Sequence, residues 1–142
     1  MTHAKPPDNP MAEQLPDLLE AMKRECRERM KRAEEALALC PAELSVETCC
    51  NRVHQEFDSL HGAARAANLQ GVEGFSRLVA QVARNTRKRG EQSDLDPHIR
   101  DLLEAAIQLT SRCFEGADPG SIEEQKDVRH LTHRMKSLLA PL

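Results

Sequence analysis

The sequence is poor in aromatic residues and carries no strong excess of charge of either sign. Its 142 residues include three Phe and neither Trp nor Tyr, while Ala, Leu, Glu, Arg and Lys are abundant. This composition favours helices packed through aliphatic side chains over a sheet-based fold. The formal net charge of -3 provides no field that would draw the whole protein onto nucleic acid or an anionic membrane. Charge alone therefore names no partner.

The sequence also lacks paired cysteines and long apolar runs. Its five cysteines are odd in number and include no C-x-x-C pair. Most fall within helical apolar patterns, so we expect small buried thiols in a reducing cytoplasm rather than disulfides or a zinc site. No apolar run approaches the roughly 20 residues needed to cross a bilayer, and the first ten residues contain no hydrophobic signal region. We therefore expect a cytoplasmic protein.

Apolar residues at helical spacing predict five helices and no strand. Residues 1–10 carry three prolines and predict a disordered tail, so that residues 11–142 form a single domain. Short connections make successive helices antiparallel. The expected fold class is all-α, an antiparallel up-and-down four-helix bundle with an additional C-terminal helix. Whether that last helix packs on the others or mediates self-association stays open. The helices are expected at about residues 16–40, 45–67, 71–88, 97–115 and 121–139.

Several residues predict where these helices begin. Pro16 suits the first position of the first helix, because a proline there needs no N–H. Ser45 and Asp96 suit the N-caps of the second and fourth helices. Ser121 and Glu124 have the spacing of a capping box for the fifth helix.

Two strips of residues run along the second predicted helix. The apolar strip should face the core and comprises Val46, Cys50, Val53, Phe57, Leu60 and Ala64. The polar strip follows one residue later, about 100° round the helix, and we expect it to be solvated. It comprises His54, Asp58, His61 and Arg65. Gly62 lies beside it, at a cost of about 1 kcal/mol relative to Ala. Either a close helix crossing requires this glycine, or a partner needs bare backbone there.

The run LHGAARAANLQGVEGFSRLVAQV, residues 60–82, resembles the histidine-containing phosphotransfer (HPt) domain, in particular the amino-terminal phosphotransfer domain of chemotaxis histidine kinases. That family's pattern is H-x-L-K-G, then small residues, a helix break and a third helix that opens with an apolar residue. The positions that match without a gap are Leu60, Gly62, Ala63, Ala64, Leu69, Val72 and Leu78. The resemblance extends more loosely over residues 11–138. It implies an antiparallel four-helix bundle whose second helix presents an exposed histidine, with the glycine leaving room for a receiver domain.

The sequence departs from the family at the positions that carry its chemistry. Asp58 stands where the family has its phosphoacceptor histidine, and His61 stands where it has a lysine. The ungapped alignment places Arg77 and Ala80 where chemotaxis kinases have a histidine and a glutamate near the acceptor. A neutral imidazole nitrogen can attack a phosphoryl donor, whereas a carboxylate needs a metal ion and further charged groups around it. The resemblance therefore implies a partner-binding face without phosphate relay.

We accordingly expect a degenerate HPt-like signalling protein that binds a response-regulator receiver domain, a histidine kinase or a related two-component partner. The expected partner-binding residues are His54, Asp58, His61, Gly62 and Arg65. We expect no catalytic residue, no cofactor and a monomer. One alternative is an active histidine phosphotransfer protein that uses His61 or His54 as its acceptor.

Two other kinds of site fit parts of the sequence. His54, Asp58 and His61 lie at i, i+4 and i+7, a spacing that suits metal ligands and would make the protein a metal-binding helical bundle. The basic run ARNTRKRG, residues 83–90, invites a nucleic-acid interpretation. However, cations at the carboxyl end of a helix complement its dipole, and no aromatic residue is available there to stack a base. We expect neither nucleic acid nor a membrane as a partner.

Overall fold

The structure is a computed structural model that describes residues 10–88, 94–115, 122 and 125–140. Within these ranges the chain is all-helical, with five helices and no strand, as the sequence predicts. The helices are α1 (Pro10–Leu39), α2 (Val46–Ala66), α3 (Gln70–Lys88), α4 (Pro97–Glu115) and α5 (Lys126–Leu139). The tail predicted at residues 1–10 lies outside the described residues except for Pro10, where α1 begins.

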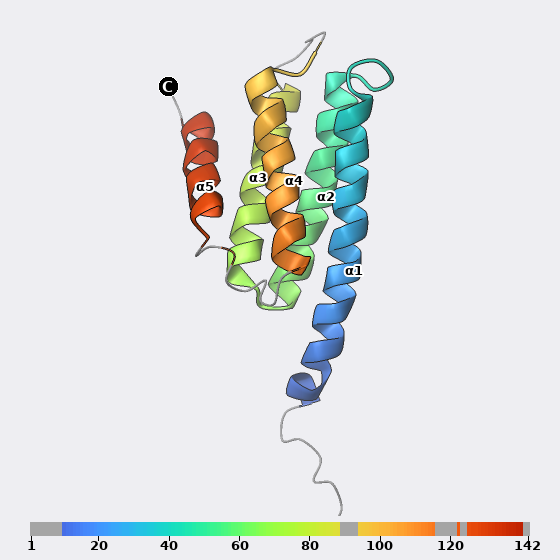
Figure 1. The fold of residues 1–142 in the computed structure, drawn as a ribbon, viewed down its shortest axis with the longest axis vertical. Helices are drawn as coiled ribbons and strands as arrows, with labels where there is room; N and C mark the ends of the chain where they lie inside the picture. Colours follow the sequence, from blue (N-terminus) through green and yellow to red (C-terminus); the bar gives the residue numbers. More distant parts are fainter. Residues whose placement is uncertain (1–9, 89–93, 116–121, 123–124, 141–142) are drawn as a thin grey trace, which may run out of the picture.

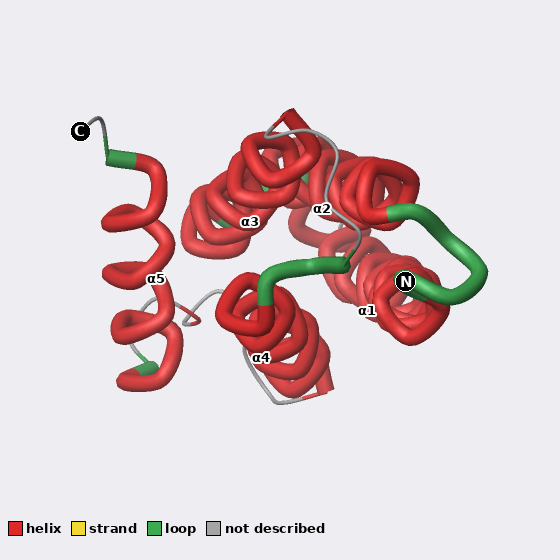
Figure 2. The backbone as a smooth tube through the Cα atoms, turned by 90° about the horizontal axis from the view of Figure 1, so that it is seen from above, coloured by secondary structure: helices red, strands yellow, loops and turns green. Residues whose placement is uncertain are grey.

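Helices α1 to α4 surround a common interior, and α5 lies to one side of them (Figure 2). Contacts join α1 to α2 and α4, α2 to α3, and α3 to α4. Successive helices alternate in direction (Figure 1). Helix α5 packs against α3 and α4, with Val128, Leu131 and Met135 buried. The C-terminal helix therefore packs on the other helices, a point that the sequence left open.

The predicted N-caps are present at α2 and α4. The Ser45 hydroxyl accepts a hydrogen bond from the Thr48 N–H at 3.1 Å. The Asp96 carboxylate accepts from the N–H groups of His98 at 2.8 Å and Ile99 at 3.4 Å. These oxygens satisfy N–H groups that have no partner in the first turn of a helix. Both helices consequently begin where the sequence predicts.

Two other helices begin at different residues from those expected. Helix α1 begins at Pro10 rather than Pro16, so it continues through a proline. Pro16 removes only one backbone donor, and the turns on either side of it remain helical. Helix α5 begins at Lys126, after Gln125, whose side chain makes no capping hydrogen bond. The capping box predicted at Ser121 lies outside the described residues.

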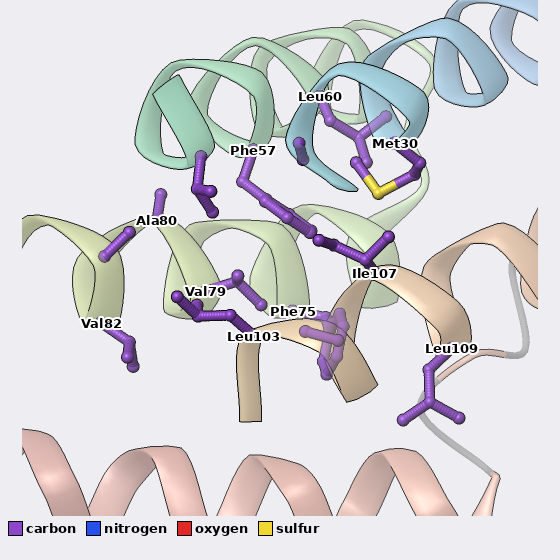
Figure 3. Close-up of a cluster of buried hydrophobic side chains, with 14 of the residues drawn as sticks. Met30, Phe57, Leu60, Phe75, Val79, Ala80, Val82, Leu103, Ile107 and Leu109 are labelled. Carbon is purple, nitrogen blue, oxygen red and sulfur yellow. The ribbon is translucent and has the colours of Figure 1, made fainter. Parts of the chain in front are cut away.

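The core is made of aliphatic side chains, methionines, cysteines and three phenylalanines, and Figure 3 shows part of it. Figure 3 shows Phe57 of α2 reaching toward Ile107 of α4, with Met30 of α1 and Val79 of α3 in the same interior. Phe57 and Val79 have no exposed surface. Phe57 is the largest of the fully buried side chains among the described residues. Removal of this side chain would therefore leave a large cavity in the core.

The five cysteines all lie in the described part of the chain, where they are buried thiols rather than disulfides. Burial raises the pKa of the Cys26 and Cys49 thiols to about 12, and that of Cys50 to about 11. These thiols are therefore neutral packing groups, as the sequence predicts. Among the described residues, no helix combines the length and the apolar character that crossing a membrane requires.

Candidate functional site

Helix α2 has one buried side and one exposed side. All six members of the apolar strip are no more than 2% exposed. On the other side, Asp58, Gly62 and Arg65 are exposed. We call these three residues the docking patch. His54 and His61, which belong to the same predicted strip, are only half-buried at its edge.

The two histidines turn toward α3 rather than into solvent. The Nδ1 atom of His54 lies 3.0 Å from the carbonyl oxygen of Ala80, and that of His61 lies 3.0 Å from the carbonyl oxygen of Glu73. The expectation that the whole polar strip is solvated is therefore wrong for these two residues. These two rings lie at the seam between α2 and α3, where the neighbouring helix covers part of each, whereas Asp58 and Arg65 of the same strip stay exposed.

These hydrogen bonds define the tautomer of each neutral imidazole. A carbonyl oxygen can only accept, so Nδ1 of each ring must carry the proton and donate it. The lone pair of the neutral ring is then on Nε2. In each histidine, Nδ1 is therefore hydrogen-bonded to α3, and Nε2 can accept a proton or attack an electrophile.

A further side-chain hydrogen bond lies on the same seam. Arg87 Nη1 donates to Asn51 Oδ1 at 2.7 Å. Together with the hydrogen bonds of His54 and His61, this bond joins α2 to α3 along eleven residues of α2, from Asn51 to His61. Arg87 belongs to the basic run, so part of that run holds the fold together instead of facing a nucleic acid. Arg89 and Gly90 at the end of the run lie outside the described residues.

Asp58 lies on α2 between the two histidines in sequence. Among the described residues it takes part in no hydrogen bond or ion pair. Nor is any group of three or more His, Cys, Asp or Glu side chains in the described ranges placed to hold a metal ion. The metal-binding alternative that combines His54, Asp58 and His61 therefore finds no support in their arrangement. An isolated carboxylate also lacks the surroundings in which acyl phosphates form.

Packing does not explain the presence of a glycine at position 62. A Cβ built at this position would meet nothing within 4 Å. The first of its two explanations, a close helix crossing, is therefore wrong. A glycine in a helix interior still costs about 1 kcal/mol relative to alanine. The docking patch thus keeps a stretch of bare backbone that contributes nothing to the stability of the fold.

Arg77 and Ala80 of α3, which the ungapped alignment places where chemotaxis kinases have supporting groups, lie in different surroundings. Arg77 lines a groove between α3 and α5, away from α2. Ala80 is buried and contributes its carbonyl oxygen to His54. Sequence reasoning missed this carbonyl and that of Glu73, because a backbone acceptor has no sequence signature. It also missed the groove, for which two glycines on one side of α3, Gly71 and Gly74, were the available signal.

Comparison with known proteins identifies no relative of this chain. No family model matches it, and neither a curated protein nor a solved structure does. The resemblance to the HPt domain accordingly depends on the motif in residues 60–82 and on its looser extension along the chain.

Proposed function

We propose that this chain is a degenerate HPt-like signalling protein that binds a response-regulator receiver domain or a related two-component partner without relaying phosphate. The observation that carries the proposal is Gly62. This residue is exposed in the interior of a helix, no packing requirement accounts for it, and it occupies the position at which the HPt motif makes room for a receiver.

The arrangement of the helices fits this proposal. We take α1 to α4 as an antiparallel up-and-down four-helix bundle of the HPt kind, with α5 as an additional C-terminal helix. The ring of contacts among α1 to α4 and their alternating directions support this assignment. In such a bundle α2 is held on both sides, so the docking patch is presented on a rigid helix.

The chemistry of the docking patch suits a protein partner. Bare backbone at Gly62 lets a partner helix approach α2 more closely than any side chain would allow. Asp58 and Arg65 on either side supply one hydrogen-bond acceptor and one planar donor group. His54 and His61 border the patch, so a docked partner would cover their outer edges. We include both in the partner-binding surface.

Asp58 is the reason for proposing binding without phosphate relay. Its short carboxylate stands at the position of the family's acceptor, but it has no nucleophilic nitrogen, and among the described residues no side chain pairs with it to support a phosphoryl group. It is also a weak mimic of a phosphorylated histidine, because it carries one charge where a phosphoryl group carries nearly two. The protein would then compete with a true phosphotransfer protein or act as an adaptor. Its buried thiols suit a reducing cytoplasm.

One observation favours a second candidate function, an active phosphotransfer protein. The Nδ1 atoms of His54 and His61 are bonded to carbonyl groups, which leaves Nε2 of each neutral ring as a nucleophile. His61 is the stronger candidate, because it adjoins Gly62 in the docking patch. Either acceptor would be displaced along α2 from the family's position by about one turn, roughly 5 Å. A receiver docked in the family's manner would therefore be poorly aligned with it.

Phosphotransfer separates these two functions. The protein is incubated with purified histidine kinases and phosphorylated receiver domains, and acid-labile phosphate is measured on wild type, His54→Ala and His61→Ala. Asp58→Ala serves as the matched control, since it changes the same surface without removing an imidazole. Receiver binding without label on any of the four proteins supports the degenerate protein. Stoichiometric label that disappears in one histidine variant alone establishes the active one instead.

A further inference from the structure

A groove of about 500 Å³ runs between α3 and α5. Its apolar lining includes Phe75 and Leu78 of α3 and Val128 of α5, and its cations are Arg77, Arg129 and Lys136. None of the described residues that line it is an Asp or a Glu. This arrangement is unusual in a chain whose acidic residues outnumber its basic ones, 23 to 20. It shares no residue with the docking patch or its two histidines.

The three cations are available to a ligand. All three are exposed, and among the described residues none of them forms a hydrogen bond or an ion pair. Other arginines of the chain do find carboxylate partners, as Arg29 and Arg32 do with Glu56. Cations gathered without a counter-charge around an apolar surface raise the local potential and attract anions.

The wall of the groove on α3 is kept open by glycine. Gly74 lines the groove, and a Cβ built there would meet nothing within 4 Å. As at Gly62, packing gives no reason for a glycine in the interior of this helix, where it costs about 1 kcal/mol relative to alanine. A side chain at this position would project into open space beside the apolar lining and reduce the room for a ligand.

The size of the groove indicates what it can hold. Small-molecule sites typically occupy about 300–1,000 Å³, are largely apolar and carry a few polar groups that orient the ligand. A partner helix lying along the twelve residues from Gln70 to Gln81 would be about 18 Å long and about 10 Å wide, hence roughly 1,400 Å³. That is more than twice the available volume. The groove therefore fits a small molecule better than a whole helix.

We propose that the groove between α3 and α5 binds a small organic anion, a carboxylate or phosphate group carried on an apolar body. The apolar body lies on Phe75, Leu78 and Val128, while Arg77 and Arg129 pair with the anionic group from opposite walls. Guanidinium groups suit this role because their planar donors match carboxylate and phosphate oxygens. Lys136 is seven residues from Arg129, about 10 Å along α5, and accommodates a second anionic group.

The probe for this site is anilinonaphthalenesulfonate, an organic anion with an aromatic body whose fluorescence rises in apolar surroundings. We expect saturable binding to the full-length protein. The double variant Arg77→Gln, Arg129→Gln should weaken it at least tenfold, because each charge-assisted contact is lost. Gly74→Leu, which fills the groove from its wall, should weaken it as strongly. Arg134→Gln on α5, an exposed cation outside the groove lining, should leave it unchanged.

Competition identifies the anionic group and tests the role of charge. Dodecanoate and dodecyl phosphate should both displace the probe, and the tighter of the two shows which group the site prefers. Dodecyltrimethylammonium, with the same tail and the opposite charge, should not displace it. Equal displacement by the cation, or full binding by Gly74→Leu, would overturn the proposal. Displacement by an acidic helical peptide but by neither dodecyl anion would also overturn it, because the groove would then be a protein-docking surface.

The groove variants lie outside the docking patch. A negative result in these binding experiments therefore leaves the proposed function standing.

Discussion

The two sides of α2 are explained by different physical causes. On the buried side, six side chains lose nearly all their exposure, and the packing of α2 against α1 and α3 stabilises the fold. On the exposed side, a Cβ built at Gly62 would meet nothing within 4 Å, so the glycine lowers helix stability without any packing requirement. A residue that stability does not favour and packing does not require points to an interaction outside the fold. The comparison thus separates structural residues of α2 from candidate binding residues.

The largest effect expected is at the centre of the buried side. Phe57→Ala should lower the free energy of unfolding by about 3–5 kcal/mol, because it leaves a cavity in a packed core. Chemical denaturation followed by circular dichroism measures it. Its neighbour on the exposed side, Asp58→Ala, is the matched control and should change stability by no more than about 0.5 kcal/mol. A similar loss in both variants would remove the distinction between the two sides.

The buried thiols should make the protein sensitive to alkali. Cys50 belongs to the apolar strip, and burial raises its pKa from 9.0 to about 11. Above about pH 9 the unfolded chain releases this proton while the folded chain retains it, so stability falls as pH rises toward the folded pKa. Each such thiol contributes a loss of about 1.4 kcal/mol per pH unit in that window, and nothing below it.

The variant Cys50→Ala, which lacks this thiol, is the control for the pH dependence. Denaturant unfolding of wild type and Cys50→Ala is compared between about pH 8 and about pH 11. The stability difference between the two proteins should shift in favour of Cys50→Ala as pH rises, since lysines titrate equally in both. A difference that stays constant over this range would mean that Cys50 is not held neutral by burial.

On the exposed side of α2 we expect a smaller change in the free energy of unfolding, and an increase instead of a loss. Gly62→Ala should raise the free energy of unfolding by about 1 kcal/mol, because alanine favours the helix and its Cβ has space. Gly74→Ala on α3 is in the same situation and should gain a similar amount. Thermal or chemical denaturation measures both changes. Destabilisation by Gly62→Ala would show that the fold itself requires the glycine, and the argument for a docking patch would fail.

The smallest expected change in stability is at the seam between α2 and α3. His61→Ala removes the bond to the Glu73 carbonyl and should cost about 0.5 kcal/mol, the low end for a hydrogen bond because the ring is half-buried. Nitrogen-15 NMR of the wild type should show the Nδ1–H tautomer for both His54 and His61 in their neutral forms. The Nε2–H tautomer at either ring would contradict its bond to α3 and with it the nucleophilic role of its Nε2 atom.

Local sequence signals predicted the parts of this fold that depend on local interactions. Ser45 and Asp96 cap their helices as expected, because a cap involves only the first turn. The apolar strip around Phe57 was predicted equally well, since helical periodicity decides which side is buried. The partners of His54 and His61 were not predictable. Each is a backbone carbonyl 26 or 12 residues away, and only the packing of α3 against α2 brings it within reach.

In the candidate site, too, some features follow from local sequence and others only from the packing of distant helices. Sequence pattern identified the polar strip but left two explanations for Gly62, and the space around this residue removes one of them, the close helix crossing. The groove between α3 and α5 depends on where α5 packs, which no capping signal or periodicity determines. Helix α1 likewise continues past Pro16, because a single missing donor did not end it.

The central claim is that Gly62, and not open space on a helix in general, is needed for receiver docking. Gly62 and Gly74 form a matched pair, since each is exposed in a helix interior with nothing within 4 Å of a built Cβ. Isothermal titration of a panel of purified receiver domains compares wild type, Gly62→Leu and Gly74→Leu, with folding verified by circular dichroism. We predict that Gly62→Leu loses receiver binding and Gly74→Leu retains it. Retained binding by Gly62→Leu, or no binding of any receiver by the wild type, would contradict the account.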